Sequence, residues 1–176
     1  MKKWLIPLII LVVIAFGIYQ WAVGFNNTAV ELEANAKTAW SNVESAYQRR
    51  NDLIGNLVKT VQGAADFERG TLKDVIEARS KATNTTIDAN NITPEKLAAF
   101  QEAQTGLSSA LSRLLVTVER YPDLKANRNF LELQSQLEGT ENRINVERNR
   151  FNETVNLYDI HTTKFPGKIL AGWFGF

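Results

Sequence analysis

The chain has 176 residues, with 20 Lys or Arg, 19 Asp or Glu, one His and no Cys. This length suits one ordinary domain, and the lack of cysteine excludes disulfides, thiolate zinc sites, iron–sulfur clusters and a cysteine nucleophile. A single histidine excludes a multi-His metal site within one chain, and a net charge of +1 gives no broad electrostatic reason to bind nucleic acid.

An uncharged apolar segment runs from Trp4 to Val23. It has about the 20 residues that a helix needs to cross the hydrocarbon core of a bilayer. Trp4 lies at one end and Tyr19 and Trp21 at the other, as in the aromatic belts at headgroup depth. Residues 1–24 therefore predict an N-terminal segment with a transmembrane helix at about 4–23, and the lipid bilayer as a partner.

The basic residues predict how this segment is oriented. Lys2 and Lys3 precede it and the next basic residue is Lys37, which places the N-terminus in the cytoplasm and the rest of the chain outside. A cleaved signal peptide is the alternative, since Ala22 and Gly24 are small residues at a suitable spacing. The length of the apolar segment and the bulky Trp21 favour the anchor.

Residues 25–29 predict a short polar hinge or N-cap, because Asn26, Asn27 and Thr28 follow the apolar segment directly. Residues 30–164 then predict a helical bundle. Apolar residues recur at steps of three and four from Ala36 to Ala65, and Arg50 falls on the same face.

Gly63 and Gly70 bracket a predicted break, so we expect one helix over about 30–61 and a second over about 66–83. A single continuous helix is the alternative.

The polar stretch from Asn84 to Thr93 predicts a loop, with Thr93 as N-cap and Pro94 as the first residue of the next helix. Pro122 ends that helix. Its apolar seam, with one polar step at Gln104, consists of Leu97, Phe100, Leu107, Leu111, Leu114, Val118 and Tyr121.

Asp123 or Asn127 can cap the last helix, whose stripe runs from Phe130 to Thr162. With the elements before it, this predicts an all-α fold: an N-terminal transmembrane helix followed by an antiparallel up-down four-helix bundle.

Charged residues fall on the predicted core faces. Glu141 and Arg148 lie seven apart on the last stripe, and Arg50 is their natural counterpart on the first. A charge at a core position is costly unless it is paired, so we expect Glu141 to contact Arg50, Arg148 or both. These three residues are a candidate structural ion network. The alternative is a ligand or partner site.

The closing residues 165–176 form an apolar aromatic tail whose one charge is Lys168. Such a tail predicts a short amphipathic anchor at the membrane interface or a contact with a neighbouring subunit. Docking on the end of its own bundle is the alternative. The candidates for membrane or subunit contact are Trp4, Tyr19, Trp21, Phe165, Trp173, Phe174 and Phe176.

No catalytic motif is present. The single histidine, His161, has Tyr158 three residues before it instead of the acid that a di-iron bundle needs. There is no G-x-S-x-G elbow and no glycine loop of a nucleotide site. We therefore expect no enzyme, no catalytic residue, no cofactor and no metal site, with His161 on the surface.

Four stretches of the sequence resemble the LemA family: AWSNVESAYQRRNDLIGNLV from Ala39, IEARSKA from Ile76, the long block from Val118 to Val155, and the closing FPGKILAGWFGF. The resemblance implies a bacterial single-pass membrane protein with an antiparallel four-helix body and no established enzymatic activity. It also implies relatives associated with membrane organisation, the magnetosome membrane among them. One departure is Gly55, where the family pattern usually has proline.

The stretches that resemble the LemA family also contain residues that ion pairs inside the bundle do not fully explain. They form a candidate interaction surface: Arg49, Asp52, Tyr121, Pro122, Asp123, Lys125, Asn142 and Arg143.

The leading hypothesis is a non-enzymatic, membrane-anchored helical scaffold that acts through self-association, as a homo-oligomer, or by binding other membrane proteins. The alternative is a sensor-like module that binds a small ligand between helices and signals through a partner. A carboxylate-based hydrolase is a third hypothesis, which no residue pattern supports.

Overall fold

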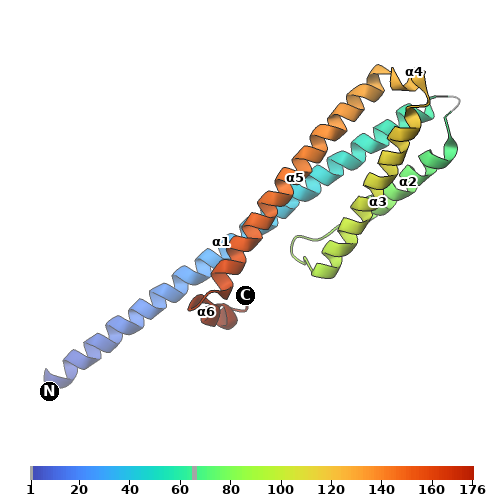
Figure 1. The fold of residues 1–176 in the computed structure, drawn as a ribbon. Helices are drawn as coiled ribbons and strands as arrows, with labels where there is room; N and C mark the ends of the chain where they lie inside the picture. The colour runs from blue at the N-terminus through green and yellow to red at the C-terminus, as the bar shows by residue number, and fades with distance from the viewer. Residues whose placement is uncertain (1, 65–66) are drawn as a thin grey trace. The chain divides into compact units, whose positions relative to one another are not determined.

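The computed structural model describes residues 2–64 and 67–176, and all regular secondary structure in these residues is helical. The all-α fold class is thereby confirmed. The helices are α1 (Lys2–Gln62), α2 (Arg69–Asn84), α3 (Pro94–Val118), α4 (Pro122–Lys125), α5 (Arg128–Thr163) and α6 (Gly167–Phe174) (Figure 1).

The chain divides into two compact units. Residues 1–38 and 150–176 form the terminal unit, and residues 39–149 form the central unit. Helices α1 and α5 each contribute residues to both units.

The predicted hinge at residues 25–29 is wrong, because α1 continues through it from Lys2 to Gln62. Phe25 and Ala29 lie one helical turn apart and both are buried. Packing of this face stabilises the helix and outweighs the weak local preference of Asn26, Asn27 and Thr28 for caps and turns. For the same reason no helix starts at Val30, where we expected one, and α1 continues through this residue.

The predicted break between Gly63 and Gly70 is confirmed, and a single continuous helix is excluded. Helix α1 ends at Gln62 and α2 begins at Arg69. The expected start of the second helix, Asp66, lies outside the described residues. Phe67 directly follows it and is buried against Tyr121, with ring centroids 4.8 Å apart.

The N-terminus of α3 has the expected cap. Thr93 is extended, its hydroxyl accepts a hydrogen bond from the Lys96 backbone N–H at 3.3 Å, and Pro94 is the first helical residue. The pKa of Glu95 is lowered, first by a hydrogen bond from its own backbone N–H and then by one from Thr93. The ionised carboxylate is therefore favoured at this helix end.

Two details between α3 and α5 go beyond the sequence prediction. Residues Pro122–Lys125 form the short helix α4, which buries Leu124. Of the two predicted caps of the last helix, Asn127 has this position, because its Oδ1 accepts the backbone N–H groups of Asn129 at 2.9 Å and Phe130 at 3.2 Å.

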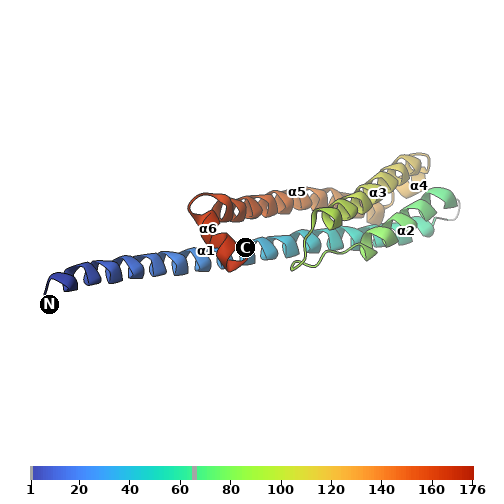
Figure 2. The same cartoon turned by 90° about the horizontal axis from the view of Figure 1, so that it is seen from below.

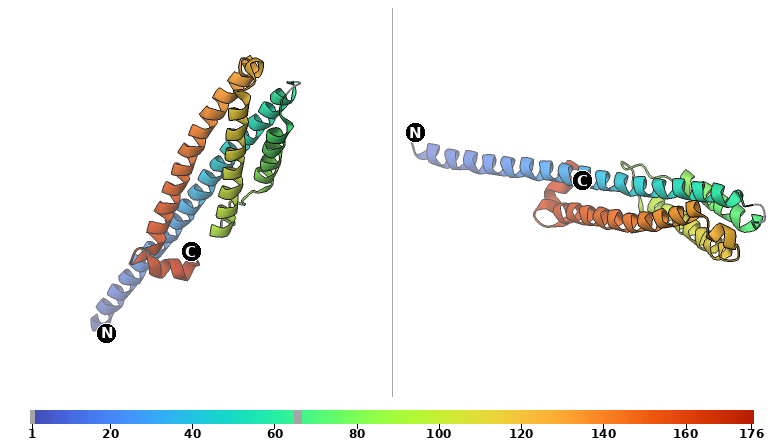
Figure 3. Two further views of the ribbon diagram at one scale, coloured as in Figure 1. Left: turned by 45° about the vertical axis from the view of Figure 1, so that its right-hand side comes forward. Right: turned by 90° about the horizontal axis from the view of Figure 1, so that it is seen from above.

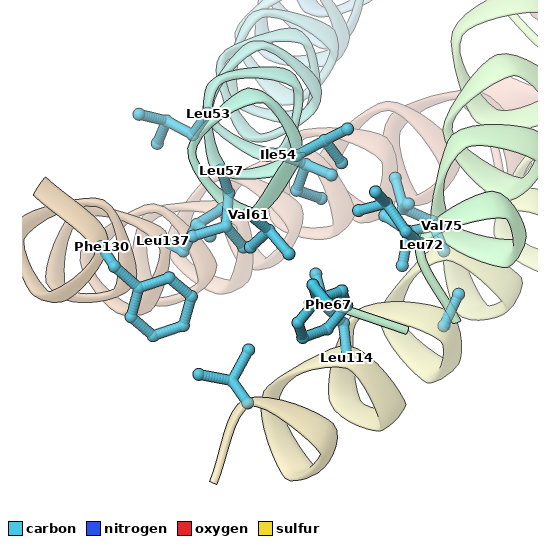
Figure 4. Packing of buried hydrophobic residues seen from close by; sticks show 14 of the residues in the cluster. Leu53, Ile54, Leu57, Val61, Phe67, Leu72, Val75, Leu114, Phe130 and Leu137 are labelled. Carbon is cyan, nitrogen blue, oxygen red and sulfur yellow. The ribbon is translucent and has the colours of Figure 1, made fainter. Parts of the chain in front are cut away.

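The core of the central unit collects apolar side chains from all five helices that enter it. Helices α2 and α3 lie side by side (Figure 2). Figure 4 labels ten core residues: Leu53, Ile54, Leu57, Val61, Phe67, Leu72, Val75, Leu114, Phe130 and Leu137. Burial of this set supplies the main favourable free energy of folding for the unit.

The terminal unit contains the apolar segment. Of the described helices, α1 alone is long and apolar enough to cross a membrane: an 18-residue window in it has a mean hydropathy of 2.3 and no buried residue. The large side chains from Trp4 to Tyr19 are exposed. Near the end of this segment, α6 packs beside α1 at Phe25 (Figure 3).

Two glycines inside helices offer a test of local packing. No atom of another segment lies within 4 Å of a Cβ added at Gly106 or Gly139. Gly106→Ala and Gly139→Ala should each raise the free energy of unfolding by about 0.5 to 1 kcal/mol, because alanine restricts the unfolded chain. Urea unfolding of the full chain in detergent, followed by circular dichroism, measures this change.

Gly55→Ala is the matched control, because its Cβ would lie 3.0 Å from the Arg79 guanidinium carbon. The displaced guanidinium offsets the gain in helix propensity. A stabilisation of Gly55→Ala equal to that of the other two variants would contradict this packing.

The Thr93 cap provides a second test. Thr93→Ala should lower the free energy of unfolding by about 1 kcal/mol, whereas Thr93→Ser should be close to neutral. Because the pKa of Glu95 is lowered in the folded state, its contribution is present at neutral pH and is lost as the pH falls through the folded pKa. The cost of Thr93→Ala should therefore shrink in acid, which unfolding curves at neutral and acidic pH measure.

Candidate functional site

A buried guanidinium forms the polar centre of the central unit. Arg50 of α1 is only 4% exposed. Its Nη1 lies 3.0 Å from Glu141 Oε2 of α5 and donates to Ser108 Oγ at 3.1 Å, while its Nη2 donates to Gln104 Oε1 at 2.6 Å. The Arg50 Cζ lies 4.9 Å from the Tyr47 ring centroid. One side chain thus links α1, α3 and α5.

Gln104 extends these contacts to a fourth helix. Its side-chain amide donates to the Ala82 carbonyl of α2 at 3.5 Å, and its backbone carbonyl accepts from Arg50 Nη2 at 3.4 Å. In the sequence, Gln104 can be recognised only as one polar residue on an otherwise apolar helix face. Its role as the partner of Arg50 depends on which face of α3 meets α1, which the spacing within α3 does not specify.

The contact between Glu141 and Arg50 is present, but Arg148 is exposed and does not take part in it. Thr140 and Glu147 of α5 are buried instead, each one position before a predicted charge. Between the buried residues Leu137, Ile144 and Phe151, which are seven apart, the intervening core position can lie three or four residues on, and in α5 it lies three residues on. Glu141 therefore lies at the edge of the core, with its side chain 52% exposed.

A second polar contact lies at the next residue of α1, Asn51. Arg79 Nε of α2 donates to the Asn51 carbonyl at 2.7 Å, and its guanidinium lies over Gly55. Asn51 itself is 6% exposed, and its side-chain Oδ1 has no hydrogen-bond partner. Asn51 could not be singled out from the sequence, because the spacing of residues does not reveal whether a buried amide is paired.

A pocket of about 360 Å³ opens beside Asn51. Its lining includes the carboxylates of Glu44 and Asp52 and the rings of Tyr47 and Phe100, and it contains no Lys or Arg. The rings of Tyr47 and Phe100 meet edge to face at 5.0 Å. A site of this composition favours a small cation that can also donate hydrogen bonds.

The predicted interaction-surface residues lie on separate elements. Tyr121 is half-buried against Phe67, and Lys125 pairs with Glu119 next to α4. The other six are exposed: Arg49, Asp52, Pro122, Asp123, Asn142 and Arg143. Among the residues that the structure describes, no hydrogen bond or ion pair joins the groups on α1, α4 and α5 into one patch.

The terminal unit contains a second candidate site, where α5 and α6 meet α1. His161 of α5 stacks on Phe25 with ring centroids 4.4 Å apart, and its Nε2 lies 3.0 Å from the Phe25 carbonyl oxygen. The expectation of a surface histidine is therefore wrong: His161 is half-buried and attaches the end of α5 to α1. Its partner is distant in sequence, so no local pattern reveals the contact.

Tyr158 lies one turn before this junction. Burial raises the pKa of its hydroxyl, the charges of Glu33 and Asp159 raise it further, and Lys37 opposes them. The phenol therefore stays neutral at physiological pH.

The aromatic residues predicted to meet a membrane or a subunit are exposed, apart from Phe176. Trp4, Tyr19, Phe165 and Trp173 are 85%, 63%, 82% and 84% exposed. Trp21 and Phe174 are about half exposed, while Phe176 packs against the cluster formed by Phe25, Leu170 and Ala171.

Comparison with known proteins matches residues 39–176 to the LemA family. The chain belongs to this family. The match covers the whole central unit and the C-terminal part of the terminal unit, including α6.

Relatives of this LemA family protein come from several bacteria. It is 28% identical over 171 residues to the magnetosome proteins MamQ 1 and MamQ 2 of Paramagnetospirillum magneticum, covering 85% of this chain and 61% of each relative. It is 26% identical over 166 residues to Protein LemA of Metamycoplasma hominis, covering 94% of this chain and 69% of that one. The chain thus spans about three fifths of the length of the magnetosome relatives. None of these names states an enzymatic activity.

The Arg50 contacts lead to a stability prediction. Arg50→Ala should lower the free energy of unfolding by about 3 kcal/mol, because it leaves the buried Gln104 Oε1 without its donor and opens a cavity between the helices. Glu141→Ala should cost about 1 kcal/mol, since Glu141 is half exposed and three other acceptor atoms, on Ser108 and Gln104, remain for Arg50. Urea unfolding of the full chain in detergent measures both changes.

Arg49→Ala is the control, because the neighbouring arginine is exposed and should change stability by less than about 0.5 kcal/mol. Equal losses for Arg49→Ala and Arg50→Ala would contradict the central role of Arg50.

Proposed function

We propose that this LemA family protein is a non-enzymatic, membrane-anchored helical scaffold of the bacterial envelope. It acts through self-association or by binding other membrane proteins. The observation that carries the proposal is the exposed apolar segment of α1, which in water would form a very large unpaired apolar surface. A bilayer removes that surface from water with no further partner.

The helical body supports the scaffold role. The core recruits side chains from α1, α2, α3, α4 and α5, and the remaining faces are mainly polar. An antiparallel up-down arrangement of four long helices is part of the proposal. No cluster of three or more potential metal ligands occurs in the described residues.

The proposed topology places the N-terminus in the cytoplasm and the central unit outside, because Lys2 and Lys3 precede the apolar segment. Since the chain has no cysteine, Asn27→Cys and Phe176→Cys each provide a single label site. Both should react with a membrane-impermeant maleimide in intact spheroplasts.

The unsubstituted chain is the control for that labelling. Reaction only after permeabilisation would reverse the orientation. A mature chain that begins at Phe25 and is found in the soluble fraction would overturn the anchor and the scaffold together.

The exposed arginine Arg143 on α5 provides a test of association. Arg143→Glu should reduce crosslinking of the full chain to itself or to membrane-protein partners in intact cells, without lowering thermal stability. Lys73→Glu is the matched control, since Lys73 is an exposed helical cation outside the proposed surface. Crosslinking of both variants at the level of the unsubstituted chain would count against this surface.

The pocket beside Asn51 favours a second candidate function, a ligand-binding module that signals through a partner. The unpaired Asn51 oxygen, the two carboxylates and the two aromatic rings suit a small alkylammonium ion. Putrescine should raise the melting temperature of the full chain in detergent, and Asp52→Asn should diminish the shift. An unchanged melting temperature at millimolar putrescine would reject this ligand class.

A further inference from the structure

Helix α6 has two different apolar faces. Gly167, Leu170 and Ala171 are buried and pack at Phe25 of α1. Ile169 and Trp173, four residues apart and so on one face, are 56% and 84% exposed. Phe165, in the turn between α5 and α6, is 82% exposed. One face is therefore occupied by the protein, and the other is free.

The occupied face is fixed by a close approach. A Cβ added at Gly167 would lie 2.7 Å from the Phe25 ring and 2.8 Å from the His161 carbonyl oxygen. Only glycine fits this position without moving α6 away from α1 and α5. The ring stack and the Nε2 contact of His161 fix the same junction from α5. The direction of the free face is consequently determined within the terminal unit.

The junction lies at the end of the apolar segment. Phe25 follows Val23, the last residue of that segment, by two positions. Helix α6 crosses α1 instead of running along it, as Figures 2 and 3 show. If α1 crosses a bilayer, a helix that crosses α1 at this point lies along the membrane surface at headgroup depth.

We propose that α6 is a second membrane anchor, which lies in the interface and inserts Phe165, Ile169 and Trp173 among the lipid acyl chains. The inference rests on the proposed membrane insertion of α1. Tryptophan is enriched at this depth, and a short amphipathic helix binds there through one apolar face. Lys168, one residue before Ile169 and about 100° around the helix, is exposed beside lipid headgroups.

A lipid surface fits the free face better than a second copy of the chain. The face consists of three side chains, whereas a stable protein interface buries about 800 Å² on each partner. Helix α6 also packs against Ala22 and Phe25, at the end of the apolar segment of α1, whose large side chains are exposed.

Spin labels test the proposal in the full chain, which has no native cysteine. Ile169→Cys and Trp173→Cys place nitroxides on the free face, Lys168→Cys places one beside it, and Ile10→Cys places one in the apolar segment. The protein is reconstituted into vesicles of phosphatidylethanolamine and phosphatidylglycerol. Collision rates with oxygen and with a water-soluble nickel chelate are then measured.

The ratio of oxygen to nickel collisions should be several-fold higher at positions 169 and 173 than at 168, and highest at 10. Gly167→Ala should bring the ratios at 169 and 173 down toward that at 168, because it displaces α6. Gly172→Ala is the matched control, since no atom of another segment lies within 4 Å of its added Cβ. It should leave the ratios unchanged.

Water-like ratios at 169 and 173 with a lipid-like ratio at 10 would overturn this inference and leave the anchor of α1 intact. Dipolar broadening between labels at 173 would overturn it in favour of a second copy of the chain. A water-like ratio at 10 would overturn the proposed membrane insertion of α1, and this inference with it.

Discussion

The central unit depends on neutralising one buried positive charge. Arg50 is held at the helix interfaces by oxygen atoms of Glu141, Ser108 and Gln104 and by the face of Tyr47. An arginine does not lose its proton in a protein, so burial cannot be relieved by neutralisation of the side chain itself. Apolar contacts tolerate small slips between helices, whereas these directional contacts do not. Arg50 therefore fixes the positions of α1, α3 and α5 along one another.

A different constraint acts on the terminal unit, namely the exposed apolar surface of α1. Residues 26–28 are polar and directly follow the end of the apolar segment, and the chain returns to α1 beside this point, with Phe25 in contact with α5 and α6. The protein therefore buries part of the first turns of α1 that follow the apolar segment, whereas the segment itself stays exposed.

Much of the fold could be predicted from local signals in the sequence. Thr93 with Pro94, the glycines around residue 65 and Asn127 each act within a few residues of the boundary they set, and each has the predicted role. The hinge at residues 25–29 was wrong because burial of Phe25 and Ala29 overrides local propensity. Arg148 lies outside the core because α5 has its core positions three residues after Leu137 and Ile144 instead of four, and the apolar spacing fits both. The contacts of His161, Gly167 and Asn51 join segments that are distant in sequence, so residue spacing within one helix cannot predict them.

The contact of Arg79 with the Asn51 carbonyl has a consequence for which residues α1 tolerates. In a helix this carbonyl accepts the N–H of the residue four positions on, which is Gly55. Arg79 supplies it with another donor from α2. Position 55 is therefore a place where α1 can lose a backbone hydrogen bond without an orphaned acceptor. A side chain at position 55 would nevertheless meet this donor, because a Cβ added at Gly55 lies 3.0 Å from the Arg79 guanidinium carbon. The small residue at position 55 and the Arg79 contact therefore depend on each other.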